Sequence, residues 1–348
     1  MSDDMPPTDD LTLAALGWQA FFADQVSDAD LEATPPVRVT EVHRSGLRAL
    51  GAGLDRRIPP GVAATVGDWM LLDRDRHVDS RVLDRHSLIK RRAPGKGHEV
   101  QLIAANIDTV FIVTSCTREF NVARLERYAA LTFEAGAVPV IVMTKPDLCD
   151  DAQAMADRAR TISDRVEVVV LDARSDAPRR DLARWCGPGQ TVAFLGSSGV
   201  GKSTLVNALS DGPEIATQPA READDRGRHT TTHRQMHLLG NGCVVLDTPG
   251  MRELQLTDTA DGLATLFADL EMLAGQCKFR DCAHEREPGC AIKAALDAGD
   301  IDANRVERWK VLVAEDTFNT ESLSGRRWDE KERAEGIRDR RARLGKGG

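Results

Sequence analysis

Residues 196–203 read GSSGVGKS and match G-x-x-x-x-G-K-[ST], the pattern of a loop that binds nucleotide phosphates. The pattern follows the apolar run TVAFL and precedes TLVNALS, so it stands in the strand-to-helix context that phosphate binding requires. Lys202 would neutralise the β and γ oxygens, and Ser203 would offer a hydroxyl to Mg²⁺. A glycine-rich turn is the alternative interpretation. The predicted contacts are Gly196, Ser197, Ser198, Gly199, Val200, Gly201, Lys202, Ser203 and Thr204.

Two segments downstream of this loop have the composition of nucleotide switches. DTPG at 247–250 ends the apolar run CVVLD, which predicts the Asp247 carboxylate near Mg²⁺ and the Gly250 N–H near the γ-phosphate. Before it, GRHTTTH at 227–233 offers hydroxyls as a second Mg²⁺ ligand, with Thr231 the first choice and Thr230 the second. Alone, DTPG is also a common turn, and a threonine-rich segment is also an ordinary edge strand.

TKPD at 144–147 has the chemistry to recognise guanine. It follows the apolar run VPVIVM, so Asp147 would emerge at the edge of the sheet where α/β proteins bind ligands. Its carboxylate can accept hydrogen bonds from guanine N1 and N2, whereas adenine has no such donor pair. Thr144 stands where Asn is commoner, and Asp172 stands where Ser is usual in the last purine-contacting segment; a surface turn is the alternative for TKPD. The predicted purine contacts are Thr144, Lys145, Asp147, Asp172 and Ala173.

The order of these motifs is unusual because the guanine-recognition motif precedes the phosphate loop. This is a circular permutation of the usual GTPase order, with the chain termini placed at another loop, and DTPG leads directly into the C-terminal part of the chain.

Met251 follows Gly250 where Ras-like proteins carry the glutamine that orients water, and a thioether cannot do this. We therefore expect slow intrinsic hydrolysis, with His229 or a partner's group positioning the water. A histidine without a catalytic role is the alternative for His229.

A second set of residues has the spacing of a metal site. Cys277, Cys282, His284 and Cys290 lie within fourteen residues, whereas the other four of the seven cysteines are scattered. Three thiolates and one imidazole would fill all positions of a tetrahedral Zn²⁺ and leave none for water. The sequence thus predicts one structural Zn²⁺, with free thiols as the alternative.

The intervening sequence predicts a multidomain chain. Residues 103–257 alternate apolar runs with helical patterns, near 122–135 and 153–162, which indicates an α/β domain around a mostly parallel sheet. Residues 37–102 contain short alternating stretches between Gly and Pro, typical of an OB-like β-barrel. Trp69 is the only aromatic residue of that barrel, so RNA binding there would depend on charge and shape, which favours structured RNA.

The remaining segments are a helical zinc-binding domain over 258–325, a basic tail over 326–348, and an N-terminal extension over 1–36 with an apolar segment at 11–22 and no assigned purpose.

The net charge of −9 is unevenly spread. Residues 37–100 hold 13 Lys/Arg against 8 Asp/Glu, and the tail holds 9 against 5. These basic segments favour RNA as a partner, although solubility alone also explains charged segments.

The sequence contains no apolar run of the roughly 18 residues that a membrane span needs, and its acidic start is unlike an export signal. The clustered cysteines suit a reducing compartment. We therefore expect a cytoplasmic protein without membrane or DNA partners, and a monomer is the simplest expectation.

Taken together, these motifs resemble the ribosome small-subunit-dependent GTPase A family (RsgA, also called YjeQ). The resemblance rests on VGDWMLL, AANIDTVFIVTS after Arg91-Arg92, TKPDL, GSSGVGKSTLVNAL, GRHTTTH, LDTPGMREL and CKFRDCAHEREPGC, and covers roughly residues 37–320. It implies an OB-fold, a permuted GTPase domain that binds GTP/GDP with Mg²⁺, and a zinc-bearing helical domain. It further implies binding to the small (30S) ribosomal subunit and its 16S rRNA, hydrolysis stimulated there, a role in late subunit maturation, and His229 as the catalytic candidate.

Two other functions compete with this interpretation. A P-loop ATPase or small-molecule kinase would explain residues 196–203 but has no use for TKPD or the threonine-rich switch. An RNA-binding assembly module with a vestigial nucleotide site would explain the basic segments, but the intact phosphate loop argues against it.

Overall fold

The fold is seen in a computed structural model that describes residues 11–92, 100–210, 234–247 and 256–320. The chain divides into two units. The first unit contains the described residues up to 247, and the second contains 256–320. Within these ranges, no helix combines the length and the apolar character needed to cross a membrane.

A parallel sheet forms the centre of the first unit. Its five strands run in the order β10-β9-β8-β11-β13 and pair in parallel throughout. All seven residues of β8 are buried, which is why its sequence is a continuous apolar run rather than an alternating one. The strands are β8 (Thr109–Ser115), β9 (Val138–Thr144), β10 (Glu167–Val170), β11 (Thr191–Leu195) and β13 (Val244–Asp247).

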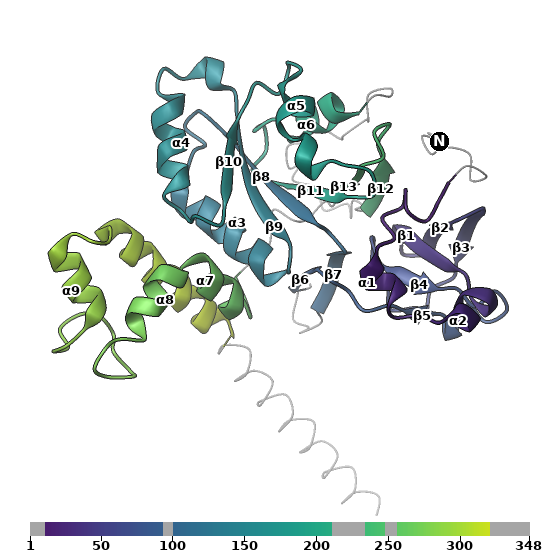
Figure 1. The fold of residues 1–348 in the computed structure, drawn as a ribbon, viewed down its shortest axis with the longest axis horizontal. Coiled ribbons are helices and arrows are strands. Elements are labelled where there is room, and N and C mark those ends of the chain that lie inside the picture. The colour runs from purple at the N-terminus through teal and green to yellow at the C-terminus, as the bar shows by residue number, and fades with distance from the viewer. Residues whose placement is uncertain (1–10, 93–99, 211–233, 248–255, 321–348) are drawn as a thin grey trace, which may run out of the picture. The chain divides into compact units, whose positions relative to one another are not determined.

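Helices cover both faces of this sheet (Figure 1). The helices α3 (Val122–Glu134) and α4 (Ala152–Arg160) connect β8 to β9 and β9 to β10, and right-handed connections place both on one face. The chain then reverses direction across the sheet, so α5 (Ala177–Asp181) and α6 (Lys202–Leu209) lie on the other face. The predicted α/β domain is therefore confirmed, with β9, which leads into TKPD, before β11, which leads into GSSGVGKS, in sequence.

The N-terminal strands form an antiparallel sheet in the order β3-β2-β1-β4-β5. Strand β12 (Arg234–Leu238), which the sequence analysis did not predict, joins it to the parallel sheet by pairing with both β13 and β1. Among the described residues β3 does not pair with β5, the contact that would close a barrel, so the OB-like barrel stays a prediction. The strands are β1 (Pro36–His43), β2 (Gly46–Gly51), β3 (Leu54–Ile58), β4 (Trp69–Leu71) and β5 (Arg81–Val82).

A separate hairpin connects these two regions. Its strands are β6 (Leu88–Arg92) and β7 (Val100–Ala105), which pair antiparallel. The expected boundary between residues 102 and 103 lies inside β7, whose residues become continuously buried from Ile103 onward.

The N-terminal extension packs against the first unit instead of standing apart from it. Its residues Leu11, Leu16 and Phe22 are buried in a cluster with Trp69. Phe22 lies in the short helix α1 (Ala20–Ala23), which is followed by α2 (Asp28–Ala33). The buried Arg38 guanidinium donates hydrogen bonds to three carbonyls from separate segments, Leu16 O at 2.5 Å, Gly67 O at 3.2 Å and Asn106 O at 3.1 Å. Since a buried charge without partners is costly, this arrangement ties the extension to the sheets.

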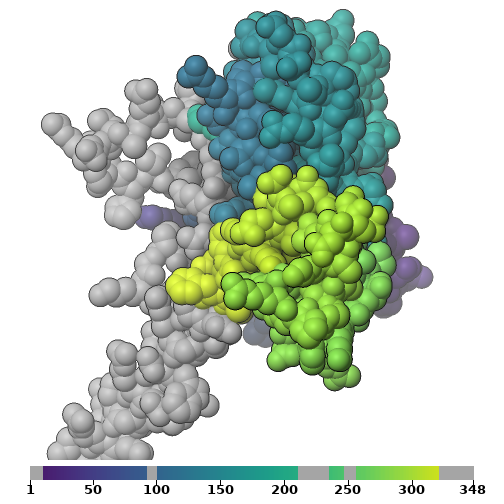
Figure 2. Space-filling model, turned by 90° about the vertical axis from the view of Figure 1, so that its left-hand side faces the viewer, coloured from purple at the N-terminus to yellow at the C-terminus, as the bar shows by residue number. Residues whose placement is uncertain are grey.

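The second unit is helical, as the sequence predicts. It contains α7 (Ala260–Leu266), α8 (Ala268–Ala274), α9 (Ala291–Ala298) and a helical segment over 303–320, drawn as green and yellow atoms in Figure 2. Apolar side chains of this unit are fully buried, among them Phe267, between α7 and α8, and Ile292 of α9. The Asp316 carboxylate accepts from the Thr259 N–H at 3.0 Å and its hydroxyl at 2.7 Å, which fixes the start of α7.

Candidate functional site

The phosphate loop lies between β11 and α6 and depends on glycine at two positions. Gly196 has φ 150°, and a Cβ atom there would stand 2.2 Å from the Val113 carbonyl oxygen, too close for any other residue. Gly201 has φ 99°, a left-handed conformation that directs the chain into α6 at Lys202. Ser203 and Thr204 are exposed in the first turn of α6, where the helix presents its N–H groups. The backbone thus has the form that anion binding requires.

Two ammonium groups approach this loop. The Lys202 Nζ donates to Gly196 O at 2.8 Å and to Ser197 O at 2.5 Å. The Lys145 Nζ arrives from the end of β9 and donates to Gly199 O at 2.7 Å. Their positive charges suit the phosphates of a nucleotide, and the second contact brings TKPD against the phosphate loop.

Thr144 joins the guanine-recognition strand to the phosphate loop. Its side chain is buried, and its hydroxyl donates to Val200 O at 2.6 Å and lies 3.2 Å from Thr114 O. The carbonyls come from the loop and from β8, the strand between β9 and β11. Thr144 therefore supports the loop through its hydroxyl, a role that the sequence analysis did not assign to it.

Asp147 lies in a short 3-10 helix, Pro146–Leu148, directly after the left-handed Lys145. Its Oδ2 accepts a hydrogen bond at 2.8 Å from Nη2 of Arg174, whose Nε lies 3.3 Å from Asp172 Oδ1. The Arg174 backbone N–H also donates to Asp172 Oδ1 at 3.0 Å, and this is the main cause of a lowered pKa for Asp172. Ala173, between them, is buried. The structure thus brings together the predicted purine contacts.

Arg174 was missed in the sequence analysis. The sequence did offer one signal for Arg174, a positive charge directly after the Asp172-Ala173 pair. In the structure, this charge lies between the carboxylates of Asp147 and Asp172. The Arg174 side chain is 67% exposed, so its two ion pairs are open to solvent.

Several predicted site residues lie outside the described residues. They are His229, Thr230, Thr231, Gly250 and Met251. For Asp247 the structure describes only the backbone, which ends β13 next to β11. Since parallel neighbours end at one edge of a sheet, the Asp247 backbone and the phosphate loop share that edge.

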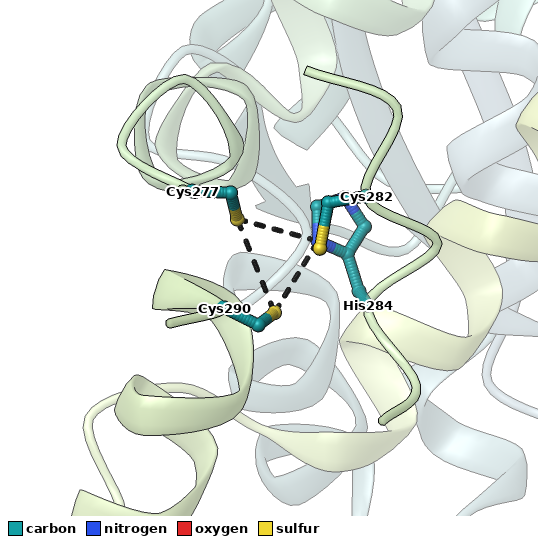
Figure 3. Close-up of side chains that lie close together, drawn as sticks. All are labelled: Cys277, Cys282, His284 and Cys290. Atoms are coloured by element: carbon teal, nitrogen blue, oxygen red, sulfur yellow. Dashed lines mark hydrogen bonds between the residues drawn. The ribbon is translucent and has the colours of Figure 1, made fainter. Parts of the chain in front are cut away.

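The second unit gathers the four predicted metal ligands (Figure 3). The Cys277 Sγ lies 3.6 Å from His284 Nδ1 and 3.9 Å from Cys290 Sγ, and Cys290 Sγ lies 3.5 Å from His284 Nδ1. The four ligand atoms, including that of Cys282, all lie within 4.8 Å of one another. In a tetrahedral Zn²⁺ site, bonds of about 2.0–2.3 Å place the ligands roughly 3.5–3.8 Å apart. The residues present therefore fit Zn²⁺.

Backbone donors support this cluster. Ala291 N–H lies 3.3 Å from Cys277 Sγ, and Lys293 N–H lies 3.4 Å from Cys290 Sγ at the start of α9. Burial acts to raise the pKa of Cys277, but the backbone N–H groups of Ala291 and Ile292, with the Cys290 and Cys282 side chains, outweigh it and lower that pKa, which favours the thiolate that binds metal.

The Glu287 carboxylate shapes the loop that contains His284. The Glu287 side chain accepts from the backbone N–H groups of Ala283, Glu285 and Arg286 at 2.9–3.0 Å, and these bonds lower the pKa of Glu287 to about 2. His284 lies inside this loop with φ 58°. The sequence analysis did not identify Glu287, because such a loop contact leaves no spacing pattern.

Comparison with known proteins adds independent evidence. The family model for "RsgA GTPase" matches residues 82–257. A protein of Mesorhizobium japonicum named "Small ribosomal subunit biogenesis GTPase RsgA" is 48% identical over 325 residues, covering 91% of this chain and 93% of that protein. A protein of Vibrio parahaemolyticus named "Small ribosomal subunit biogenesis GTPase RsgA 2" is 45% identical, covering 90% of this chain and 88% of that protein.

Two solved structures are similar in fold. YjeQ from Thermotoga maritima is 25% identical with a TM-score of 0.58, covering 80% of this chain and 97% of that chain. YloQ, described as a circularly permuted GTPase, is 22% identical with a TM-score of 0.55, covering 81% of this chain and 94% of that chain. The fold similarity agrees with the permuted order of the motifs.

Proposed function

Because the chain belongs to the RsgA GTPase family, we propose that it binds GTP at residues 196–204 and hydrolyses it under stimulation by the small ribosomal subunit. Members of the family are GTP hydrolases, and this chain is a GTPase of ribosome biogenesis. The observation that carries the proposal is the hydrogen bonding of Thr144 and Lys145 to the phosphate loop, since it couples guanine recognition to phosphate binding.

At the nucleotide, Asp147 accepts from guanine while Lys145, Asp172 and Ala173 border the base. Lys202 neutralises the phosphates, which are cradled by the backbone of the loop. Mg²⁺ supplies charge neutralisation when bound. The Ser203 and Thr231 hydroxyls would hold the ion, with the Asp247 carboxylate near it.

The γ-phosphate is detected by the N–H of Gly250. With Met251 in place of a water-orienting glutamine, His229 or a ribosomal group positions the water, and the intrinsic reaction is slow. This explains why a partner that completes the site would stimulate the reaction strongly.

The partner is the small subunit with its 16S rRNA, and the activity belongs to late subunit maturation. Residues 37–102, as an OB-like domain, and the basic tail at 326–348 contribute positive charge for rRNA. The buried Trp69 leaves that domain no stacking platform, which supports recognition by charge and shape. Residues 103–257 are the GTPase domain, and 258–325 hold the structural Zn²⁺. The protein acts as a cytoplasmic monomer, without membrane or DNA.

Guanine specificity is tested by competition of GTP and ATP for a labelled guanine nucleotide, on the parent protein and on Asp147→Ala. We expect ATP to compete far more weakly with the parent, and Asp147→Ala to lose most of that preference. Tighter ATP than GTP binding, or unchanged selectivity in Asp147→Ala, would instead support the ATPase or kinase alternative.

Subunit preference is tested by co-sedimentation of the protein with purified small or large subunits in the presence of a non-hydrolysable GTP analogue. We expect binding to small subunits alone, weakening as salt is raised because phosphate contacts release counterions. Equal binding to both subunits would contradict the proposed partner.

A further inference from the structure

We propose that Arg174 determines guanine specificity by positioning the Asp147 carboxylate, a role that rests on the proposed GTPase function. The observation is one guanidinium that bonds two carboxylates from different strand ends. Arg174 reaches Asp147, after β9, at 2.8 Å and Asp172, after β10, at 3.3 Å. When Arg174 bonds one side of the Asp147 carboxylate, the remaining lone pairs of that carboxylate keep one direction. This orientation favours a partner that donates two hydrogen bonds, such as guanine through N1 and N2.

The residue at 172 explains why a cation is needed. A hydroxyl at this position can donate a hydrogen bond to a neighbouring carboxylate, whereas an ionised Asp172 can only accept. Without a donor, Asp147 would face a second negative charge, and repulsion would turn it away from the base. Arg174 supplies the donor that Asp172 lacks and neutralises the repulsion between the two carboxylates.

The local backbone keeps Arg174 in reach of both. Asp172 Oδ1 accepts from the Arg174 N–H at 3.0 Å, and the Ser175 hydroxyl donates to Asp172 O at 2.8 Å. This closed turn follows β10 directly, so its position is set by the sheet. Arg174 is thus placed by Asp172 and in turn places Asp147.

Binding of GDP and of IDP to the full-length chain tests this role, because inosine lacks the 2-amino group that donates to Asp147. In Arg174→Ala we expect GDP affinity to fall roughly three- to fivefold, the effect of an exposed ion pair, and IDP affinity to fall less. The GDP-to-IDP preference therefore decreases. Arg174→Lys should keep part of that preference, since one ammonium cannot bond both carboxylates in the same way.

A matched control is Arg180→Ala, which removes an exposed arginine of α5 that pairs with Asp181 rather than with Asp147 or Asp172. It should leave both affinities unchanged. In the Arg174→Ala background, Asp172→Ser should recover part of the preference by returning a hydroxyl donor and removing the repelling charge. No recovery would overturn the role given to Asp172.

An unchanged preference in Arg174→Ala, or equal weakening of GDP and IDP, would overturn the positioning role. Tighter GDP binding in Arg174→Ala would also overturn it, because it would make Arg174 a competitor of guanine for Asp147. These outcomes differ from failure of the proposed function, in which the parent protein itself would show no preference for guanine nucleotides over ATP.

Discussion

The nucleotide site of the first unit and the Cys/His cluster of the second unit are assembled in different ways. All four sulfur and nitrogen ligands of the cluster come from fourteen consecutive residues. The nucleotide site takes its described parts from the ends of β9, β10 and β11, which are distant in sequence and are brought to one edge only by the sheet. We therefore expect the cluster to depend on a bound ion, whereas the nucleotide site depends on the core that aligns its strands.

This difference teaches where stability resides in each site. Residues of the cluster are half-exposed apart from Cys290, so little apolar burial holds them together without metal. Thr144, by contrast, is fully buried at the point where strand, neighbouring strand and phosphate loop meet. A substitution in the cluster should therefore change zinc content without changing nucleotide binding, and a substitution in the nucleotide site should do the reverse.

The largest effect is expected from loss of the metal. Cys282→Ser should abolish bound zinc and destabilise the second unit by about 3 kcal/mol or more. The reason is that the free energy of binding a structural Zn²⁺ contributes directly to the stability of the folded state. Metal analysis and thermal unfolding measure this, and GDP affinity should stay unchanged. Cys149→Ser, outside the cluster, should retain one zinc per chain. Full stability of the metal-free protein would refute a structural role for the ion.

The next largest effect is on catalysis. Lys202→Ala removes the charge that neutralises the β and γ oxygens, so basal GTP turnover should fall by about 100-fold or more while zinc content is kept. Phosphate release measures this. Lys293→Ala, an exposed lysine of α9, should turn over GTP at the parent rate. If Lys202→Ala kept full turnover, the site would be vestigial and the RNA-binding alternative would be favoured.

A smaller effect is expected at Thr144. Thr144→Val keeps the shape but leaves Val200 O without its donor, which should cost about 1–3 kcal/mol in unfolding free energy and weaken GDP binding. Denaturant unfolding and GDP titration measure the two changes. Thr132→Val removes a buried hydroxyl that bonds Tyr128 O within α3, so it should lose stability without losing GDP affinity. Equal GDP affinity in both variants would contradict the support of the loop by Thr144.

The smallest effect concerns pH. Burial lowers the pKa of His86, assisted by Arg38 and opposed by Asp108, so the folded first unit takes up fewer protons than the unfolded chain. Stability should therefore fall as the pH decreases through about 6.5, and His86→Gln should reduce this fall. Denaturant unfolding between pH 7.5 and 6 compares the two proteins at saturating zinc. An identical pH dependence would show that His86 does not contribute.

Much of both sites is predictable from sequence because local patterns specify it. The phosphate loop needs glycine where the backbone is left-handed or approaches Val113 O, and the cluster needs four ligands at short spacing. The strands β8, β9 and β11 follow from apolar runs that only a doubly covered sheet can bury.

The rest of the two sites and of the fold depends on contacts between residues that are far apart in sequence, and no motif spacing predicts such contacts. The bond from Thr144 to Val200 spans 56 residues and exists because β9 and β11 flank β8. Arg174 reaches Asp147 across 27 residues because β9 and β10, the strands that precede them, pair in parallel. The packing of the N-terminal extension around Trp69, and the joining of two sheets by β12, likewise depend on tertiary pairing.

The central claim is tested most directly by GTP turnover of the purified protein alone, with small ribosomal subunits, and with large subunits. We expect slow turnover alone and a large stimulation by small subunits only, because the chain carries Met251 where a water-orienting glutamine would stand. Fast turnover that is indifferent to either subunit would contradict the account.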